Sequence, residues 1–392
     1  MANNNAILTT LTAATNMMLG ATAIENMSLQ NIVDTGASWD FEQKDQWAKA
    51  LTGLIIKDIY PMTTYENRSN DVFYEDAAMF GAAMRVIDIE MPDVIENRAW
   101  EVFTSGTSTI GSNKVYLPIV NQKLYGNSVS WAIPLAFTGT QLNEAFRSET
   151  DLLSFYNYLR LVAENSIRYH QHIMQSMNRN NYLAEKIAIP NSKGKINTVN
   201  LVEEYAKHTG ATTLTAADFL KDANALRYSI KTLKKYRDLM LEMSTLFTTD
   251  ANSKGKFVAY DRLVFQVLSD FEGLINSEVR SNTYHDEFVE MPLHRTVVAW
   301  QGLTGDSASA DFETLSSIEV TTANGATASK SGIVGLMCDK WAIMHTIVNH
   351  RVGVQRDDIK DVTLNDYQFT DRYINNLSLN GVVFTVEDYE AA

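Results

Sequence analysis

Cysteine is almost absent from this sequence of 392 residues, which contains Cys338 alone. A single cysteine excludes an intrachain disulfide and any metal site built from several thiolates. Its neighbours Leu336, Met337 and Trp341 predict that the thiol is a small buried hydrophobic group.

Long apolar runs are also missing. No run approaches the ~20 residues needed to span a membrane. Met1 to Ala6 carry no basic cluster ahead of an apolar segment, so no secretory signal is visible. We therefore expect a soluble, cytoplasmic protein with no membrane partner.

Positive charge is in deficit, because 33 Lys and Arg stand against 47 Asp and Glu, a net charge of −14. Phosphate neutralisation needs clustered Lys and Arg, so this balance argues against a dedicated nucleic-acid reader. Apolar residues make up 45% and charged residues 20%, as in ordinary globular proteins, and the length predicts two or more subregions. The densest basic run is interpreted as the solvated face of a helix; it consists of Lys231, Lys234, Lys235 and Arg237.

Glycine and proline are absent from Thr140 to Ile189, and this stretch predicts one long helix. Ser148 followed by Asp151 is typical of a capped helix start. A helix from about Glu149 to Met177 is ~43 Å long, so its apolar stripe needs cover along the whole length. The predicted stripe consists of Leu152, Phe155, Leu159, Val162, Ser166, Tyr169, Ile173 and Met177.

Before this helix the hydrophobic pattern changes to a period of two. Val129, Trp131 and Ile133 alternate with small or polar residues, as expected for a strand with one polar face. Together with the strand-like run around Val86, they predict a projecting β-hairpin arm between Thr63 and Pro134. An exposed hairpin with an apolar side is an aggregation hazard in a monomer, so its expected cover is another subunit.

The N-terminal 37 residues lack the apolar density of a domain and predict an arm that packs on other structure. Asp40 begins a short amphipathic helix that ends before Pro61. Its apolar side consists of Phe41, Trp47, Ala48, Leu51, Leu54 and Ile55.

After Pro190, helix and strand signals alternate, which predicts a compact α/β subregion. Phe257 to Tyr260 is interpreted as a strand and Asp261 to Arg280 as a helix. The last sixty residues are rich in strand signals, and Asn380-Gly381 is a strong signal for a two-residue hairpin turn.

Metal-site signals are weak. His170 and His172 point to different sides of a helix, so we expect no joint metal site. A calcium-loop spacing fails because Lys254 stands where an oxygen ligand is required; its other positions are Asp250, Asn252, Gly255 and Asp261.

Catalytic signals are equally weak. Tyr284 to Glu287 collects titratable groups and is interpreted as a solvated turn. Gly106, Ser108 and Gly111 do not have the spacing of a nucleophile elbow, and no phosphate-binding loop is present. We expect no catalytic residue and no cofactor.

The order of these parts resembles the major capsid proteins of tailed bacteriophages with the Hong Kong 97 fold, especially those of small short-tailed phages (podoviruses). The resemblance rests on Met91-Pro92-Asp93-Val94 within the hairpin segment, on the Trp131 strand that leads to the helix at Ser148, and on Asp339-Lys340-Trp341-Ala342-Ile343 before the C-terminal strands. It covers about residues 40 to 387. The implied fold is α+β.

The family's parts can be placed on the chain. The resemblance implies an N-terminal arm and short helix over 1–62, an extended β-hairpin (E-loop) over 63–137, and the spine helix of the P-domain over 138–190. An A-domain follows over 191–332, and the C-terminal strands over 333–392 complete the P-domain.

The resemblance implies a structural protein of the virion, assembled in the host cytoplasm, and not an enzyme. Hexamers and pentamers would form an icosahedral shell around double-stranded DNA without sequence-specific binding, with scaffolding and portal proteins as further partners. We expect Val129, Trp131, Ile133, Tyr116 and Tyr125 to contact neighbouring subunits. The alternatives are an encapsulin-like compartment, which would enclose an enzyme, and an α/β enzyme or binding protein of small oligomeric size.

Overall fold

The computed structural model divides the chain into two compact units, each built from separated segments. It describes residues 9, 11–17, 29–40, 42–44, 46–48, 50–51, 74–76, 84–89, 120–249, 255–280, 291–301, 311–321, 327–357 and 362–391. Unit 1 comprises Met1–Met79, Ser128–Asn178 and His345–Tyr373, and unit 2 comprises Phe80–Asn127, Arg179–Met344 and Ile374–Ala392. The segment boundaries inferred from the sequence remain predictions.

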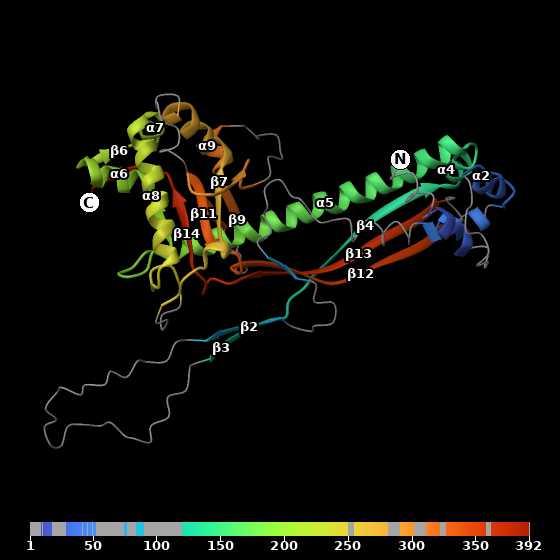
Figure 1. Cartoon of the computed structure of the whole chain (residues 1–392), viewed down its shortest axis with the longest axis horizontal. Coiled ribbons are helices and arrows are strands. Elements are labelled where there is room, and N and C mark those ends of the chain that lie inside the picture. The colour runs from blue at the N-terminus through green and yellow to red at the C-terminus, as the bar shows by residue number, and fades with distance from the viewer. Residues whose placement is uncertain are drawn as a thin grey trace, which may run out of the picture. The chain divides into compact units, whose positions relative to one another are not determined.

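Unit 1 contains a four-stranded sheet in the order β1-β12-β13-β4. Its strands are β1 (Tyr74–Asp76), β12 (Ile343–Asp357), β13 (Val362–Asn375) and β4 (Val129–Thr138), and β12, β13 and β4 run side by side (Figure 1). β4 and β13 are antiparallel, with Trp131 opposite Phe369 and Ile133 opposite Tyr367. The segment predicted as one hairpin therefore divides between two sheets, because β4 pairs with a strand more than 200 residues later in the chain.

Helix α5 (Glu149–Ala188) is the predicted long helix and has 40 residues. The predicted start is confirmed, since Oγ of Ser148 accepts a hydrogen bond of 3.1 Å from the backbone N–H of Asp151. The buried stripe differs from the prediction beyond Leu159, and Tyr169 and Met177 are exposed. The buried positions follow the helical period more closely; they are Leu152, Tyr156, Leu159, Ala163, Ile167, Gln171, Gln175 and Asn178.

The N-terminal residues of unit 1 pack into its apolar core. Trp47 is fully buried; its ring meets Phe146 edge to face at 4.8 Å, and its Nε1 donates a 3.1 Å hydrogen bond to Oγ1 of Thr15. Gly36 lies in α2 (Leu29–Ala37), where a Cβ atom would come within 2.2 Å of the Phe146 ring. Phe146 follows α4 (Gly139–Ala145), so this aromatic ring joins the arm to the start of the long helix.

Unit 2 is built around a five-stranded sheet in the order β5-β14-β11-β7-β8. β11 (Ile333–Asp339) is its centre, with every residue buried, and β14 (Gly381–Thr385) and β7 (Leu263–Leu268) pair with it on either side. β5 (Thr198–Asn200) and β8 (Arg295–Val297) are short edge strands that pair parallel to their neighbours.

Two expectations for this sheet were wrong. The stretch predicted as a helix, Asp261 to Arg280, begins with a 3-10 turn (Tyr260–Arg262) and strand β7 before α9 (Ser269–Ile275) and a π-helix (Asn276–Arg280). Five of the six residues of β7 are buried, so both faces of the strand are covered, and periodicity does not separate such a strand from a helix. Residues 257–259 form no strand, since β7 rather than this stretch pairs with β11.

Asn380-Gly381 also has a role other than the one predicted. It does not form a hairpin turn, because β13 and β14 belong to different sheets. A Cβ atom at Gly381 would lie 2.1 Å from Oη of Tyr182, so close packing against α5 requires glycine here. The turn signal and the packing requirement select the same residue, and the sequence does not distinguish them.

Helices cover the sheet of unit 2, and α8 (Ala223–Leu241) is the longest that lies wholly within it. Tyr236 of α8 meets Phe384 of β14 edge to face at 5.7 Å. The other elements are α6 (Leu201–Thr209), α7 (Ala216–Lys221), α10 (Phe312–Leu315), the pair β6 (Thr213–Leu214) and β15 (Tyr389–Glu390), and the pair β9 (Ile318–Thr321) and β10 (Thr327–Lys330).

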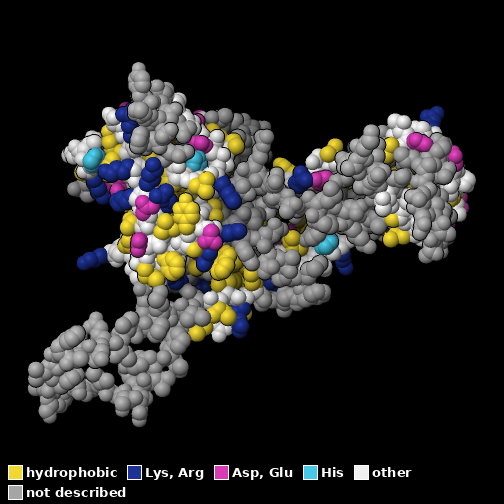
Figure 2. All heavy atoms as spheres, viewed as in Figure 1, with side chains coloured by type: hydrophobic (Ala, Val, Ile, Leu, Met, Phe, Trp, Pro, Cys, Tyr) yellow, Lys and Arg dark blue, Asp and Glu magenta, His cyan; other side chains and the backbone are white. Residues whose placement is uncertain are grey.

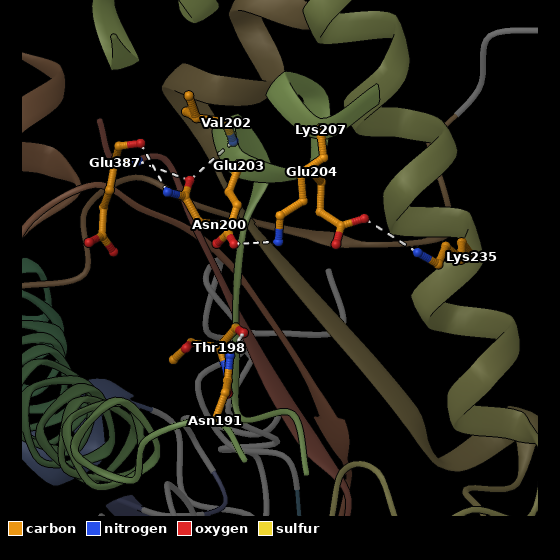
Figure 3. A network of polar contacts seen from close by, with 9 residues as sticks. All are labelled: Asn191, Thr198, Asn200, Val202, Glu203, Glu204, Lys207, Lys235 and Glu387. Carbon is orange, nitrogen blue, oxygen red and sulfur yellow. Dashed lines mark hydrogen bonds and ion pairs between the residues drawn. The ribbon is translucent and has the colours of Figure 1, made fainter. Parts of the chain in front are cut away.

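A polar network fixes α6 to the C-terminal strands. Asn200 caps the helix, since its Oδ1 accepts a 3.1 Å hydrogen bond from the N–H of Val202 (Figure 3). The same side-chain amide donates from Nδ2 to the carbonyl of Glu387 at 3.0 Å and accepts at Oδ1 from the N–H of Glu387 at 3.2 Å. Within the described ranges, no helix has the length and apolarity needed to cross a bilayer.

Candidate assembly surfaces

The first candidate surface is the hairpin of β2 (Met84–Ile89) and β3 (Val120–Tyr125), which forms a two-stranded sheet of its own. The strands are antiparallel, with Arg85 opposite Leu124 and Ile87 opposite Gln122. Side chains alternate between the two faces of a strand, so Ile87, Val120 and Leu124 share one face.

This face of the hairpin presents three exposed apolar side chains next to Arg85 and Gln122. Ile87 is 47% exposed, Val120 48% and Leu124 70%. A two-stranded ribbon is marginally stable by itself, and a solvent-facing apolar row on it is an association hazard. Full burial of one such side chain is worth ~2 kcal/mol, so the row offers several kcal/mol to a partner that covers it. We name these three residues the hairpin face.

Polar contacts tie the base of the hairpin to the C-terminal part of unit 2. The Nζ of Lys123 donates a hydrogen bond to Oγ of Ser378, in the turn before β14. The carbonyl of the same serine accepts from Oγ1 of Thr248 at 2.7 Å and from Nζ of Lys256 at 3.0 Å. Ser378 therefore anchors β3, the strand that carries Leu124.

The second candidate surface surrounds Trp131 on β4. Its ring stacks on Phe369 with centroids 4.2 Å apart and lies 4.3 Å from the ring of His170 on α5. The indole Nε1 donates a 2.7 Å hydrogen bond to Oδ2 of Asp371, which is buried. His350 of β12 stacks on the other side of Phe369 at 6.4 Å, so four rings form a row across the sheet.

The carboxylate of Asp371 is the electrostatic centre of this row. Nε2 of buried His345 lies 3.6 Å from its Oδ2, and the ring of His345 stacks on Tyr373 at 4.7 Å. Burial lowers the pKa of His170 and of His350, while the charge of Asp371 acts in the opposite direction. These contacts hold β4, β12 and β13 in a fixed arrangement. They do not place a nucleophile beside a base.

The residues predicted to contact neighbours lie in different surroundings. Trp131 and Ile133 are partly buried against the core of unit 1, whereas Val129 is 44% exposed beside them. Tyr125 is partly buried on the hairpin opposite Met84, on the other side of the ribbon from Leu124. Tyr116 lies outside the described residues. Their contacts between subunits remain a prediction.

Sequence reasoning missed Ile87, Val120 and Leu124, which the structure brings together on the hairpin. Val120 and Leu124 are four apart, and only the cross-strand pairing places Ile87 between them. Asp371 and Phe369 were missed as partners of Trp131 for the same reason.

Among the described residues, no group of three or more His, Cys, Asp or Glu side chains is arranged to hold a metal ion. The ring of His170 lies 4.3 Å from the ring of Trp131, tilted by 39°. Asp250, Asn252 and Lys254 of the calcium-loop spacing, and residues 284–287, lie outside the described ranges.

Solved structures of phage capsids resemble this chain. A structure from bacteriophage P68, described as its head fiber and inner core protein gp22, matches with a TM-score of 0.50 and 10% identity, covering 80% of this chain and 83% of that chain. Capsid structures of Staphylococcus phage Andhra (TM-score 0.49, 9% identity, 80% and 83% covered) and of cyanophage P-SCSP1u (0.39, 11%, 81% and 87%) also match. No curated protein sequence matches the chain.

The likeness to the P68 structure supports a shared fold, and the mixed helix and strand content of this chain is consistent with the Hong Kong 97-type fold. The comparisons give no support to an encapsulin-like compartment or to an enzyme. The sequence profile of the Phi29-like phage major capsid protein family matches residues 5–385. The chain therefore belongs to the Phi29-like phage major capsid protein family and is a structural protein of the virion that assembles into a multimeric capsid shell.

Proposed function

We propose that the hairpin face joins neighbouring copies of this chain in the shell. The observation that carries the proposal is the solvent exposure of Ile87, Val120 and Leu124 on a two-stranded ribbon. A neighbouring copy supplies the surface against which such a ribbon can bury its apolar side chains. Many modest contacts of this kind, repeated over a closed lattice, give a stable shell.

The shell in this proposal consists of hexamers and pentamers and encloses double-stranded DNA. The net charge of −14 favours weak binding of DNA. A shell protein with excess negative charge repels phosphate, which lets the genome move during packaging. Assembly takes place in the host cytoplasm with scaffolding and portal proteins. In this proposal the chain has a structural role and not a catalytic one.

The test is the substitution Leu124→Asn in the full chain. The variant is expected to remain a folded, soluble subunit and to lose shell formation, seen by electron microscopy and size-exclusion chromatography. The control is Gln122→Asn, which lies on the same face of the same strand and removes only one methylene group. Normal shells from Leu124→Asn at ordinary protein concentration would contradict the proposal.

A further inference from the structure

Positive charge gathers on two helices of unit 2. Helix α8 carries five basic residues and one acidic residue, a net charge of +4, in a chain with a net charge of −14. Helix α6, which packs beside it, carries two acidic residues and one lysine, so the two helices together have a net charge of +3 with histidine neutral. Figure 2 shows dark blue side chains gathered on the side of unit 2 where Figure 1 places α6 and α8.

One side of α8 presents a row of cations. Ser229 and Tyr236 are buried within the unit and mark the side of the helix that packs against it. The opposite side carries Arg227, Lys231 and Lys234 at i, i+4 and i+7. Arg227 and Lys231 are exposed, and Lys234 is half-buried. We name these three residues the basic face.

The carboxylates of α6 and α8 are already paired with other cations. The three ion pairs are Glu203 with Lys207 at 2.6 Å, Glu204 with Lys235 at 3.3 Å, which Figure 3 shows, and Asp238 with Arg237 at 2.7 Å. Within the described part of the chain, neither Lys231 nor Lys234 forms an ion pair. The charge that remains uncompensated on this side of unit 2 is therefore positive.

An aromatic contact orders one of these cations. The Nζ of Lys231 lies 5.3 Å from the ring centroid of Tyr228, and that ring stacks on His208 at 4.5 Å with an interplanar angle of 17°. Tyr228 also meets Tyr205, so α6 supports the exposed side of α8. A cation held on an ordered aromatic ring loses less entropy when it binds a partner.

Charge of a single sign favours nucleic acid over a second copy of the chain as the partner. Double-stranded DNA carries one negative charge per ~1.7 Å of its axis, so it presents a dense row of anions. Arg227 and Lys234 are separated by about 10.5 Å along the helix, a length that matches about three phosphates of one strand. A protein surface presents both signs of charge, and the carboxylates of α6 and α8 are not free to match its cations.

We propose that the basic face binds the phosphate backbone of the DNA inside the shell. The proposal rests on the capsid function proposed above, and it places α8 on the inner side of the shell. Lysine binds phosphate as a point charge, and contacts to the backbone carry no sequence information. The contact is therefore independent of DNA sequence and is repeated once in every subunit.

The remaining charge of the chain limits the strength of this contact. With a net charge of −14, the subunit repels phosphate away from the basic face. A row of three cations neutralises few phosphates, so each contact is weak and depends strongly on salt. The DNA next to the shell is held at separate points and still moves during packaging.

The first experiment measures acetylation rates of Lys231 and Lys234 in free subunits, in empty shells and in DNA-filled particles. Both lysines are expected to react severalfold more slowly in DNA-filled particles than in empty shells, because bound phosphate covers the amines. Exposed Lys193 and Lys340 serve as internal references and should react at the same rate in both kinds of particle.

The outcomes separate this proposal from the capsid function. Equal rates in empty and DNA-filled particles would overturn the DNA contact and leave the capsid function intact. If those equal rates are also slower than in free subunits, the basic face contacts a second copy of the chain instead. A chain that forms no shells under any condition would contradict the capsid function itself, and DNA binding by the free subunit still tests the basic face.

The second experiment measures the salt dependence of DNA binding by free subunits. The probes are fluorescent double-stranded DNAs of two unrelated sequences, which should bind equally. Lys231→Gln with Lys234→Gln is expected to bind severalfold more weakly at low salt. The slope of log K against log salt concentration should decrease in magnitude by ~1.8, the value for two lost phosphate contacts. Lys231→Arg with Lys234→Arg keeps both charges and should keep the slope.

The matched control is Lys193→Gln with Lys340→Gln, which makes the same change in net charge elsewhere on unit 2. This control should keep the wild-type slope, and thermal unfolding of both glutamine variants verifies that the subunit remains folded. Equal slopes for the two glutamine variants would overturn the proposal. Absence of DNA binding by the wild-type subunit at low salt would also overturn it.

Discussion

The indole Nε1 of Trp131 donates a hydrogen bond of 2.7 Å to Oδ2 of Asp371, across two strands that lie 240 residues apart in sequence. Asp371 is 1% exposed, so its carboxylate depends on such donors for stability. This bond and the stack on Phe369 fix β4 to β13 in unit 1. Trp131 therefore supports the strand directly before the long helix.

Removal of this donor should destabilise unit 1. Trp131→Phe keeps the ring on Phe369 but removes the shorter of two hydrogen bonds to Oδ2 of Asp371, leaving the 3.4 Å bond from Oη of Tyr373. We therefore expect a loss of about 1–3 kcal/mol in the free energy of unfolding. Urea unfolding of the free subunit measures the loss. Val129→Ala, on the exposed neighbour in the same strand, should change stability by less than about 0.5 kcal/mol. Equal effects at the two positions would contradict this role of Trp131.

Histidines near Asp371 should make stability depend on pH. Burial lowers the pKa of His170 and of His350 below the ordinary value of 6.5, so the folded state binds fewer protons than the unfolded state near pH 6. Above pH 6.5 both histidines are neutral in the folded and unfolded states, so they do not lower the free energy of unfolding. As the pH falls from 6.5 through the lowered pKa values, proton binding to the unfolded state lowers the free energy of unfolding. His170→Gln with His350→Gln should flatten the decrease in the urea midpoint between pH 7.5 and pH 5.5, as estimated from the ordinary histidine pKa of about 6.5.

The same pH titration has a matched control. The control variant is His208→Gln, which changes a histidine of unit 2 that stacks on Tyr228. A double variant with the wild-type slope would show that His170 and His350 do not carry the dependence.

Gly381 should not tolerate a methyl group while Tyr182 keeps its hydroxyl. Gly381→Ala places Cβ 2.1 Å from Oη of Tyr182, and overpacking of this kind costs about 1–3 kcal/mol. Tyr182 is fully buried and its Oη has no hydrogen-bond partner in the described structure, so Tyr182→Phe alone should be close to neutral. The combination of both substitutions should recover most of the stability in thermal unfolding. A double variant as unstable as Gly381→Ala would contradict the proposed clash.

The buried stripe of α5 can be tested at two positions that are two residues apart. Ile167 is 6% exposed and Tyr169 is 62% exposed. Ile167→Ala should lower the free energy of unfolding by about 2–4 kcal/mol through lost packing, and Tyr169→Ala by less than about 0.5 kcal/mol. Denaturant unfolding of both variants gives the comparison. The reverse order would restore the stripe predicted from sequence.

Local signals predicted the helix start but not the tertiary packing around it. The Ser148 cap and the absence of glycine and proline identify α5, because both act within a few residues. The predicted stripe drifted because repeated steps of three and four average less than the period of a real helix, and the error accumulates over 40 residues.

Pairings between distant strands leave no comparable signal. β7 was predicted as a helix because a short buried apolar run fits both structures, and only its neighbours β11 and β8 decide. The hairpin face follows from the register that sets Ile87 opposite Gln122. Alternation in one strand gives the faces but not the partner strand.

The most direct test is a cryo-electron microscopy reconstruction of the assembled shell at side-chain resolution. The hairpin of β2 and β3 is expected to lie on a neighbouring copy, with Ile87, Val120 and Leu124 buried there. A shell in which these three side chains face solvent, or a subunit that covers them with its own residues, would contradict the account.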